Sequence, residues 1–295
     1  MTPHLKGVLI TALGVLLVVP DSLFVRLIQA EPLVIAFWRG FTAGVFILCG
    51  VLVFLGVGAM RRSLATGWPS VLYMVLMGST APGFVLAVTQ TSVANVVFIF
   101  ASMPVFAAIF GWISLGERIG RRMVLTMIGV FAGLAIISLG SHGNAIASWK
   151  GDLWAVYVSV AYAAALTTVR KARDVSLIPV IPISYIGAAL VLLPFVSPME
   201  PVADQWPLLI AHGAFIALAT SLLTLGPRYI SAAEVSLLIL LESVFAPLLV
   251  WVVIGEDPSR WTLAGGAIIL GVLLASNIVL LRRKGAVSVS PGKTP

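Results

Sequence analysis

About ten runs of roughly 17 to 25 apolar residues divide this chain from near its first residue to near its last. Each run could cross about 30 Å of hydrocarbon as a helix, the form in which a segment in lipid satisfies its own backbone hydrogen bonds. Charged residues make up only 10% of the chain, against about 25% in an ordinary soluble domain. The sequence therefore predicts an all-α polytopic membrane protein, with ten transmembrane helices near 7–27, 32–57, 68–88, 93–115, 123–140, 153–169, 177–197, 207–227, 232–254 and 261–281.

The formal net charge of +7 gathers on one side of the predicted membrane, so we expect no nucleic-acid partner. Ten helices that start from the cytoplasm leave four cations outside, at Arg26, Arg39, Lys150 and Arg260. The inner side collects Lys6, Arg61, Arg62, Arg118, Arg121, Arg122, Arg170, Lys171, Arg173, Arg228, Arg282, Arg283, Lys284 and Lys293. Because cytoplasmic loops carry an excess of Lys and Arg, both termini are predicted to be cytoplasmic.

Two stretches, Ser92–Arg121 and Ser231–Arg260, can be laid over each other without a gap. The identities include a serine, an alanine, a Val-Phe-Ala run, a tryptophan, a Gly-Glu pair and an arginine. Such a set in register indicates an internal duplication. The charge distribution places the Gly116-Glu117 copy inside and the Gly255-Glu256 copy outside, so the repeat is predicted to be inverted. We expect one five-helix half over 1–145, a second, inverted half over 146–284, and a disordered tail over 285–295.

The same segments resemble a known family. The block 229–235, followed by 240–246 and by Ile254-Gly255-Glu256, is similar to the EamA domain of the drug/metabolite transporter superfamily. The first-half copy, from 91–94 through 103–106 to 115–118, is similar to the same domain. The chain departs from the family pattern at Glu242-Ser243, where Glu-Pro is usual, and at Met103, which stands in place of the glutamate.

The resemblance implies two tandem five-helix domains around a central cavity, and relatives that export amino acids, drugs and other metabolites. It also implies that the fifth and tenth helices are peripheral, with the cavity lined mainly by helices 1, 3, 4, 6, 8 and 9. Independently, an inverted repeat predicts a substrate site near the midplane, between the halves, with alternating access.

Glu242 lies about ten residues into the ninth predicted helix, or roughly 15 Å from the inner face at about 1.5 Å per residue. A carboxyl group at that depth is costly and could bind a proton or a substrate ammonium group. The alternative is a protonated, hydrogen-bonded Glu242 with a structural role only.

Asp21 and Arg39 are predicted on two consecutive antiparallel helices, at depths in the membrane that agree within about 3 Å. We expect them to form an ion pair, because pairing allows both charges to be tolerated in the membrane. The pair could be a structural clamp, an extracellular gate, or a place where Arg39 binds a substrate carboxylate. His212, about one turn inside the eighth helix, is not expected to carry protons.

The remaining candidates are side chains that could contact a substrate or mark a break in a helix. The segment Gly78–Gly83 combines glycine with proline and is predicted to be flexible or to face the cavity, with a simple proline kink as the alternative. The substrate-site candidates outside the charged groups are Ser79, Pro82, Gly83, Phe84, Gln90, Asn95, Phe98, Tyr157, Tyr162, Thr220, Thr224 and Phe245.

The chain lacks the sequence features of an enzyme, such as paired carboxylates, a histidine-rich metal cluster or a phosphate-binding glycine loop, so neither catalysis nor a cofactor or metal is expected. A channel is the main rival, although an inverted repeat favours a carrier. We expect an inner-membrane transporter that exports amino acids, including aromatic ones, with another metabolite or drug, exported or imported, as the alternative. Gly-x-x-x-Gly spacings at Gly40/Gly44 and Gly129/Gly133 predict close helix packing, and the second could also support a weak homodimer of an otherwise monomeric protein.

Overall fold

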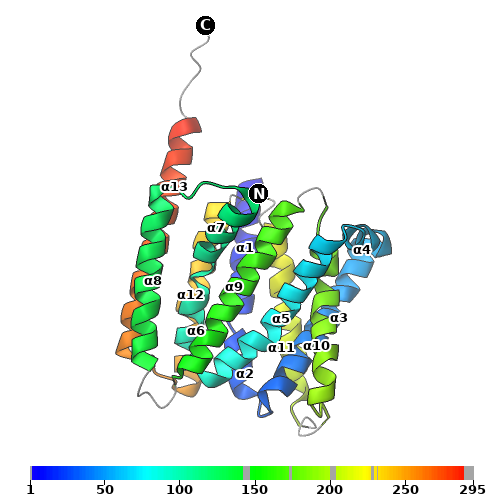
Figure 1. Cartoon of the computed structure of the whole chain (residues 1–295). Coiled ribbons are helices and arrows are strands. Elements are labelled where there is room, and N and C mark those ends of the chain that lie inside the picture. The colour runs from blue at the N-terminus through cyan, green and yellow to red at the C-terminus, as the bar shows by residue number, and fades with distance from the viewer. Residues whose placement is uncertain are drawn as a thin grey trace.

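A computed structural model describes residues 2–141, 147–172, 175–199, 204–226, 229–230 and 232–288. Within these ranges the chain forms helices and connecting turns, with no strand. Ten helical spans are long and apolar enough to cross a membrane, which confirms the predicted fold class and number of spans. α1 begins and α13 ends at the same end of the bundle (Figure 1). The predicted boundary between the halves, at 145/146, touches residues outside the described ranges.

The helices follow one another along the chain with short connections. They are α1 Pro3–Val18, α2 Asp21–Leu27, α3 Pro32–Phe54, α4 Gly56–Leu64, α5 Trp68–Gln90, α6 Val93–Phe100, α7 Met103–Leu115, α8 Arg121–Ser141, α9 Trp149–Lys171, η1 Ile178–Val180, α10 Ile181–Leu192, η2 Leu193–Phe195, α11 Trp206–Leu225, α12 Ala232–Ile254 and α13 Arg260–Ser288. α13 continues through Ser288, and residues 289–295 of the predicted tail lie outside the described residues.

Two spans are interrupted by proline. The first span breaks into α1 and α2 at Pro20, and the fourth breaks into α6 and α7 just before Pro104. Proline has no N–H to donate and disfavours helical backbone in the residue before it, so a helix commonly ends there. Pro82 and Pro247, in contrast, lie inside the continuous helices α5 and α12.

The glycines of α5 serve close packing. A Cβ added to Gly78 would lie 2.7 Å from the Ser184 carbonyl oxygen of α10, and one added to Gly83 would lie 2.9 Å from Val158 of α9. α5 is a continuous helix through 78–83, so Pro82 does not break it. Glycine here allows α5 to approach α9 and α10.

The contacts between helices are symmetrical between the first five spans and the last five. α3 packs on α10 and α8 packs on α13, while α5 packs on α9 much as α1 packs on α11. α8 and α13 lie together at one side of the bundle, away from the helices around its centre (Figure 1). A Cβ on Gly129 would lie 2.7 Å from Val272, and one on Gly133 would lie 2.6 Å from Ile269, so this glycine face is covered by α13 of the same chain.

A short helix, α4, follows α3, where the sequence predicts that the second apolar run continues to residue 57. α3 instead ends at Phe54, and Gly56 turns the chain with a φ of +73°, a left-handed conformation that favours glycine. α4 then carries Arg61 and Arg62 in its last turn.

Candidate functional site

A cavity of about 510 Å³ lies among the central helices. Its walls come from the spans that contain α1/α2, α3, α5, α6/α7, α9, α10, α11 and α12, and from the connection between α9 and α10. α3 and α10 therefore add to the six lining helices that the family resemblance implied, and α8 and α13 do not reach the cavity.

Within the part of the chain that the structure describes, the cavity reaches the surface at one end. Its lining runs from Asp21 and Arg39 to Ser176, an exposed residue in the connection that follows α9. Beyond Asp21, toward the other end of the bundle, the chain forms a tightly buried apolar cluster that includes Val25, Ile28 and Val88. The cavity is thus blocked at the α2 end and reaches the surface at the opposite end.

Asp21 and Arg39 form the predicted ion pair. Nε of Arg39 donates to Oδ1 of Asp21 at 2.9 Å and Nη2 donates to Oδ2 at 2.6 Å, so the contact is bidentate. The two residues are only 4% and 8% exposed, so almost no water screens this pair. Phe84 supports the guanidinium from one face, with 5.2 Å between Cζ and the ring centroid.

His212 joins this pair from α11. Its Nε2 lies 2.7 Å from Oδ1 of Asp21, and its ring stacks on Phe24 at 5.2 Å between centroids. An ionised Asp21 can only accept, so Nε2 is the donor. The histidine is completely buried, although its position in the sequence predicts a place near the helix end and outside the site. The contact could have been predicted from the sequence, because His212 is a lone imidazole in an apolar run at a predicted depth close to that of Asp21.

Glu242 projects from α12 into the same cavity. Its carboxyl group has no hydrogen-bond partner among the described residues, unlike that of Asp21. A cavity-facing carboxyl group without a protein partner is available to a proton or to a hydrogen-bond donor on a ligand.

Aromatic and hydroxyl side chains complete the walls. Of the predicted candidates, Phe84, Tyr162, Thr220 and Thr224 line the cavity together with the three charged groups. Phe100 packs edge-on against Tyr162, with 5.6 Å between ring centroids. Lining residues that were not among the predicted site residues include Tyr73, Met77, Phe100, Met103 and Tyr185.

Eight predicted candidates lie outside the cavity lining, and most of them have packing or hydrogen-bonding partners elsewhere. Ser79 donates to the Leu76 carbonyl oxygen within its own helix. Phe98 packs against α13, where Gly266 has no side chain to obstruct it. Tyr157 and Phe245 are about two-fifths exposed on the outer surface of the bundle. The eight residues are Ser79, Pro82, Gly83, Gln90, Asn95, Phe98, Tyr157 and Phe245.

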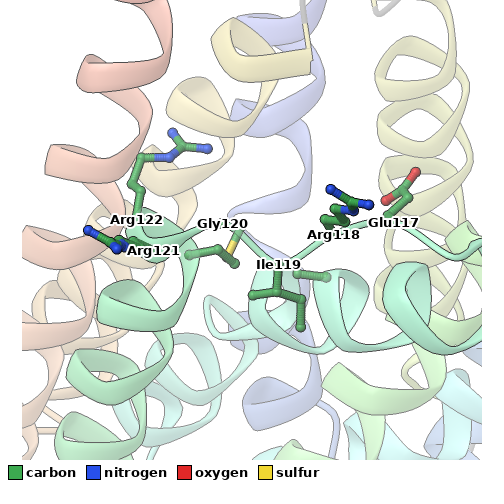
Figure 2. Close-up of a pocket in the computed structure, with 8 residues that line it drawn as sticks. Glu117, Arg118, Ile119, Gly120, Arg121 and Arg122 are labelled. Carbon is green, nitrogen blue, oxygen red and sulfur yellow. The ribbon is translucent and has the colours of Figure 1, made fainter.

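A second concavity of about 520 Å³ lies at the loop between α7 and α8. Figure 2 shows Glu117 and Arg118 on one side of this loop and Arg121 and Arg122 on the other. Arg122 donates to the Ser276 carbonyl oxygen of α13, and Glu117 forms an ion pair with Arg170. This loop lies apart from the central cavity and has no aromatic wall.

The chain matches a known protein family in both of its halves. The profile of the EamA-like transporter family matches residues 5–139 and again residues 149–277, which together make up most of the chain. The chain belongs to the EamA-like transporter family. The EamA resemblance found in the sequence is thereby confirmed, and the protein is a multi-pass membrane transporter of small molecules.

Two individual comparisons add detail. A protein named as a riboflavin transporter, from Brucella anthropi (strain ATCC 49188), is 28% identical over 253 residues, which cover 82% of this chain and 86% of that protein. A solved crystal structure with 21% identity aligns with a TM-score of 0.66 and covers 95% of this chain and 99% of that one. The second likeness supports the fold. Neither comparison names amino acids.

Proposed function

We propose that this EamA-like protein is a carrier for a small metabolite with an aromatic ring, which binds in the central cavity between Asp21–Arg39 and Glu242. The main support for this proposal is the cavity. It brings Asp21, Arg39, Glu242 and several aromatic side chains together around one space of about 510 Å³ that opens at one end. This volume falls within the roughly 300–1,000 Å³ range of small-molecule sites.

The walls favour a flat ring. Phe84, Phe100, Tyr162 and Tyr185 supply aromatic faces and edges, while Thr220 supplies a hydroxyl group. Aromatic pairs prefer offset or edge-to-face contacts, which the Phe100–Tyr162 pair already shows. A ring that enters this space can complete such contacts, and its polar groups can reach Glu242.

Within this class, the charges favour an uncharged ring system over a zwitterionic amino acid. Asp21 occupies the Nε–Nη2 edge of Arg39 with two hydrogen bonds and offsets its charge, which weakens the attraction of this arginine for a substrate carboxylate. Riboflavin is an uncharged, flat ring system with imide and hydroxyl groups, and a similar protein is named as its transporter. We therefore propose riboflavin or a related heteroaromatic compound as the first substrate to test.

Aromatic amino acids are the second candidate. Glu242 lacks a hydrogen-bond partner among the described residues and could bind the ammonium group, as expected from the sequence. The carboxylate would then bind Nη1 of Arg39, or it would replace Asp21 on this arginine while His212 retains Asp21. Export is the direction that the family resemblance implies, and we propose it for either substrate.

We propose alternating access between two inverted five-helix halves, 1–145 and 146–284, as the transport mechanism. Three observations support it: the separate matches of the two halves to one family profile, the helix contacts that treat the halves alike, and the left-handed glycines Gly116 and Gly255 at matching ends of α7 and α12. The charge distribution supports cytoplasmic termini in the inner membrane. With its glycine face covered by α13, we propose that the carrier works as a monomer.

The test is a substrate panel in proteoliposomes. Uptake of riboflavin, of aromatic amino acids and of a non-aromatic amino acid is measured with wild type and with Glu242→Gln. A carrier gives saturable uptake that is accelerated by substrate on the opposite side. The aromatic-metabolite proposal fails if only the non-aromatic compound is transported, and the carrier proposal fails if conductance is ohmic, as in a channel.

A further inference from the structure

The blocked end of the cavity carries an ion pair between the two halves. Nε of Arg26, in the last turn of α2, lies 2.9 Å from Oε2 of Glu256, in the loop between α12 and α13. The Nε–H is not aligned on the oxygen, so this contact is an ion pair and not a hydrogen bond. The side chains are only 19% and 9% exposed.

Both partners also hold the turn between α5 and α6. Nη2 of Arg26 donates to the Thr91 carbonyl oxygen at 3.0 Å, and the Val93 N–H donates to Oε1 of Glu256 at 2.6 Å. Three segments, the end of α2, the α5–α6 turn and the α12–α13 loop, therefore meet at one partly buried point. Two of them belong to the first half and one to the second.

A polar network beside this point strengthens the same junction. Thr91 and Asn95 both donate to Oδ1 of Asp152, at 2.8 and 2.9 Å, and Thr262 donates to Oδ1 of Asn95 at 2.6 Å. All four residues are buried, so the hydrogen bonds that connect these segments at the blocked end are shielded from water.

The open end carries the matching pair in a different setting. Glu117 aligns with Glu256 in the repeated segments. Arg170 lies in the last turn of α9, the first helix of the second half, just as Arg26 lies in the last turn of the first span. Glu117 and Arg170 are paired, but their side chains are 45% and 50% exposed. Thr91 aligns with Ile230, yet among the described residues Arg170 donates nothing to the Ile230 carbonyl oxygen.

We propose that these two ion pairs are reciprocal latches: the cavity is closed at the end where the pair docks on its turn, and open at the end where the pair is undocked. In this structure Arg26–Glu256 is docked on the Thr91–Val93 turn and Glu117–Arg170 is undocked. Transport exchanges the two arrangements, with Arg170 binding the Ile230 carbonyl oxygen in the other state. This inference rests on the proposed alternating access, and it adds which residues hold each state.

The energetics of the two settings support the assignment. An exposed pair contributes little, because water and salt screen it, whereas removing one partner of a desolvated pair leaves an uncompensated charge. Loss of the docked pair should therefore shift the population of states by about tenfold or more, and loss of the undocked pair should hardly affect this state.

The latch is tested by distances measured between spin labels in the full-length protein, with no substrate present. Cys49, the single cysteine, is first replaced by serine. One label pair, at Glu31 and Asp257, spans the blocked end, and another, at Arg118 and Tyr229, spans the open end between the Glu117–Arg170 pair and the turn before α12; all four positions are exposed in the structure.

In Glu256→Gln, the population with a longer distance at the blocked end should rise about tenfold, with a matching rise in shorter distances at the open end. Arg26→Gln should shift both distances in the same direction, which separates loss of the latch from misfolding of one variant. Glu117→Gln is the matched control. It should reduce the population that is closed at the open end of this structure, without lengthening the distance at the blocked end.

Unchanged distance distributions in both Glu256→Gln and Arg26→Gln, with both variants eluting as folded protein, would overturn the latch. So would equal lengthening at the blocked end in Glu117→Gln. If the distances shift as expected but no compound of the substrate panel is transported, the latch stands and the proposed substrate class fails. If transport is found without any shift, the carrier proposal stands and the latch fails.

Discussion

Replacing Arg39 by glutamine should destabilise the fold far more than the same change at a surface arginine. The substitution removes two hydrogen bonds, of 2.9 and 2.6 Å, from a carboxylate that is 4% exposed. Breaking a buried pair by removing one partner costs about 3–5 kcal/mol. We expect about 3 kcal/mol, the lower end, because His212 keeps its contact with Asp21 at 2.7 Å.

Thermal unfolding of the purified protein in detergent, followed by tryptophan fluorescence, measures this effect. At roughly 2 °C per kcal/mol for a chain of this size, Arg39→Gln should lower Tm by about 6 °C. Arg170→Gln is the control, because its pair with Glu117 is half-exposed and should contribute under about 1 kcal/mol, or about 2 °C. The double variant Asp21→Asn/Arg39→Gln should recover at least about half of the loss, since it removes the unpaired charge. Equal Tm values for Arg39→Gln and Arg170→Gln would refute the assignment of a buried, stabilising pair.

Three further predictions concern the cavity and its packing. Glu242→Gln should lower the rate of substrate uptake in proteoliposomes by about tenfold, since it removes the unpartnered cavity carboxyl group, while Glu234→Gln, at the start of α12, should stay within about twofold. Gly213→Ala should destabilise the protein by about 1–3 kcal/mol in thermal unfolding, because the new methyl carbon would lie 1.9 Å from a hydroxyl oxygen of α3, whereas Gly187→Ala meets nothing within 4 Å and should be neutral. Phe84→Leu should raise the KM of an aromatic substrate about fivefold or more with little change for a non-aromatic one, and an equal rise for both would contradict the stacking role.

Much of the fold could be predicted from the sequence because lipid leaves few alternatives. A segment without water must form its own backbone hydrogen bonds, so apolar length alone located all ten spans. What length could not reveal was where a span breaks. Pro20 and Pro104 lie at breaks between helices, while Pro82 and Pro247 lie inside continuous helices, so proline alone does not locate a break.

Charged residues of the site were predictable and most neutral ones were not. Asp21 and Arg39 had to be paired to be tolerated in the membrane, so matching depths were enough to find their contact. Depth does not determine the direction in which a helix faces. Phe245 and Tyr157 lie at suitable depths but point outward, and His212, judged by its distance from the helix end, proved to be completely buried beside Asp21.

Asn95 illustrates a further limit. An amide inside an apolar run could bind a substrate or satisfy other buried groups, and its residue type alone does not decide between them. In the structure it bridges Asp152 and Thr262 at the blocked end of the cavity. Those partners come from α9 and α13, more than 50 residues away, and only the folded arrangement brings them together.

The most direct measurement of the central claim is uptake by a variant whose cavity is filled. Thr220 lines the cavity from α11, whereas Leu218, two residues earlier, is 55% exposed on the outside of the bundle. Thr220→Trp should abolish the saturable, trans-stimulated uptake of an aromatic substrate in proteoliposomes, while Leu218→Trp should retain it. Full uptake by a folded Thr220→Trp protein would show that the substrate takes another route.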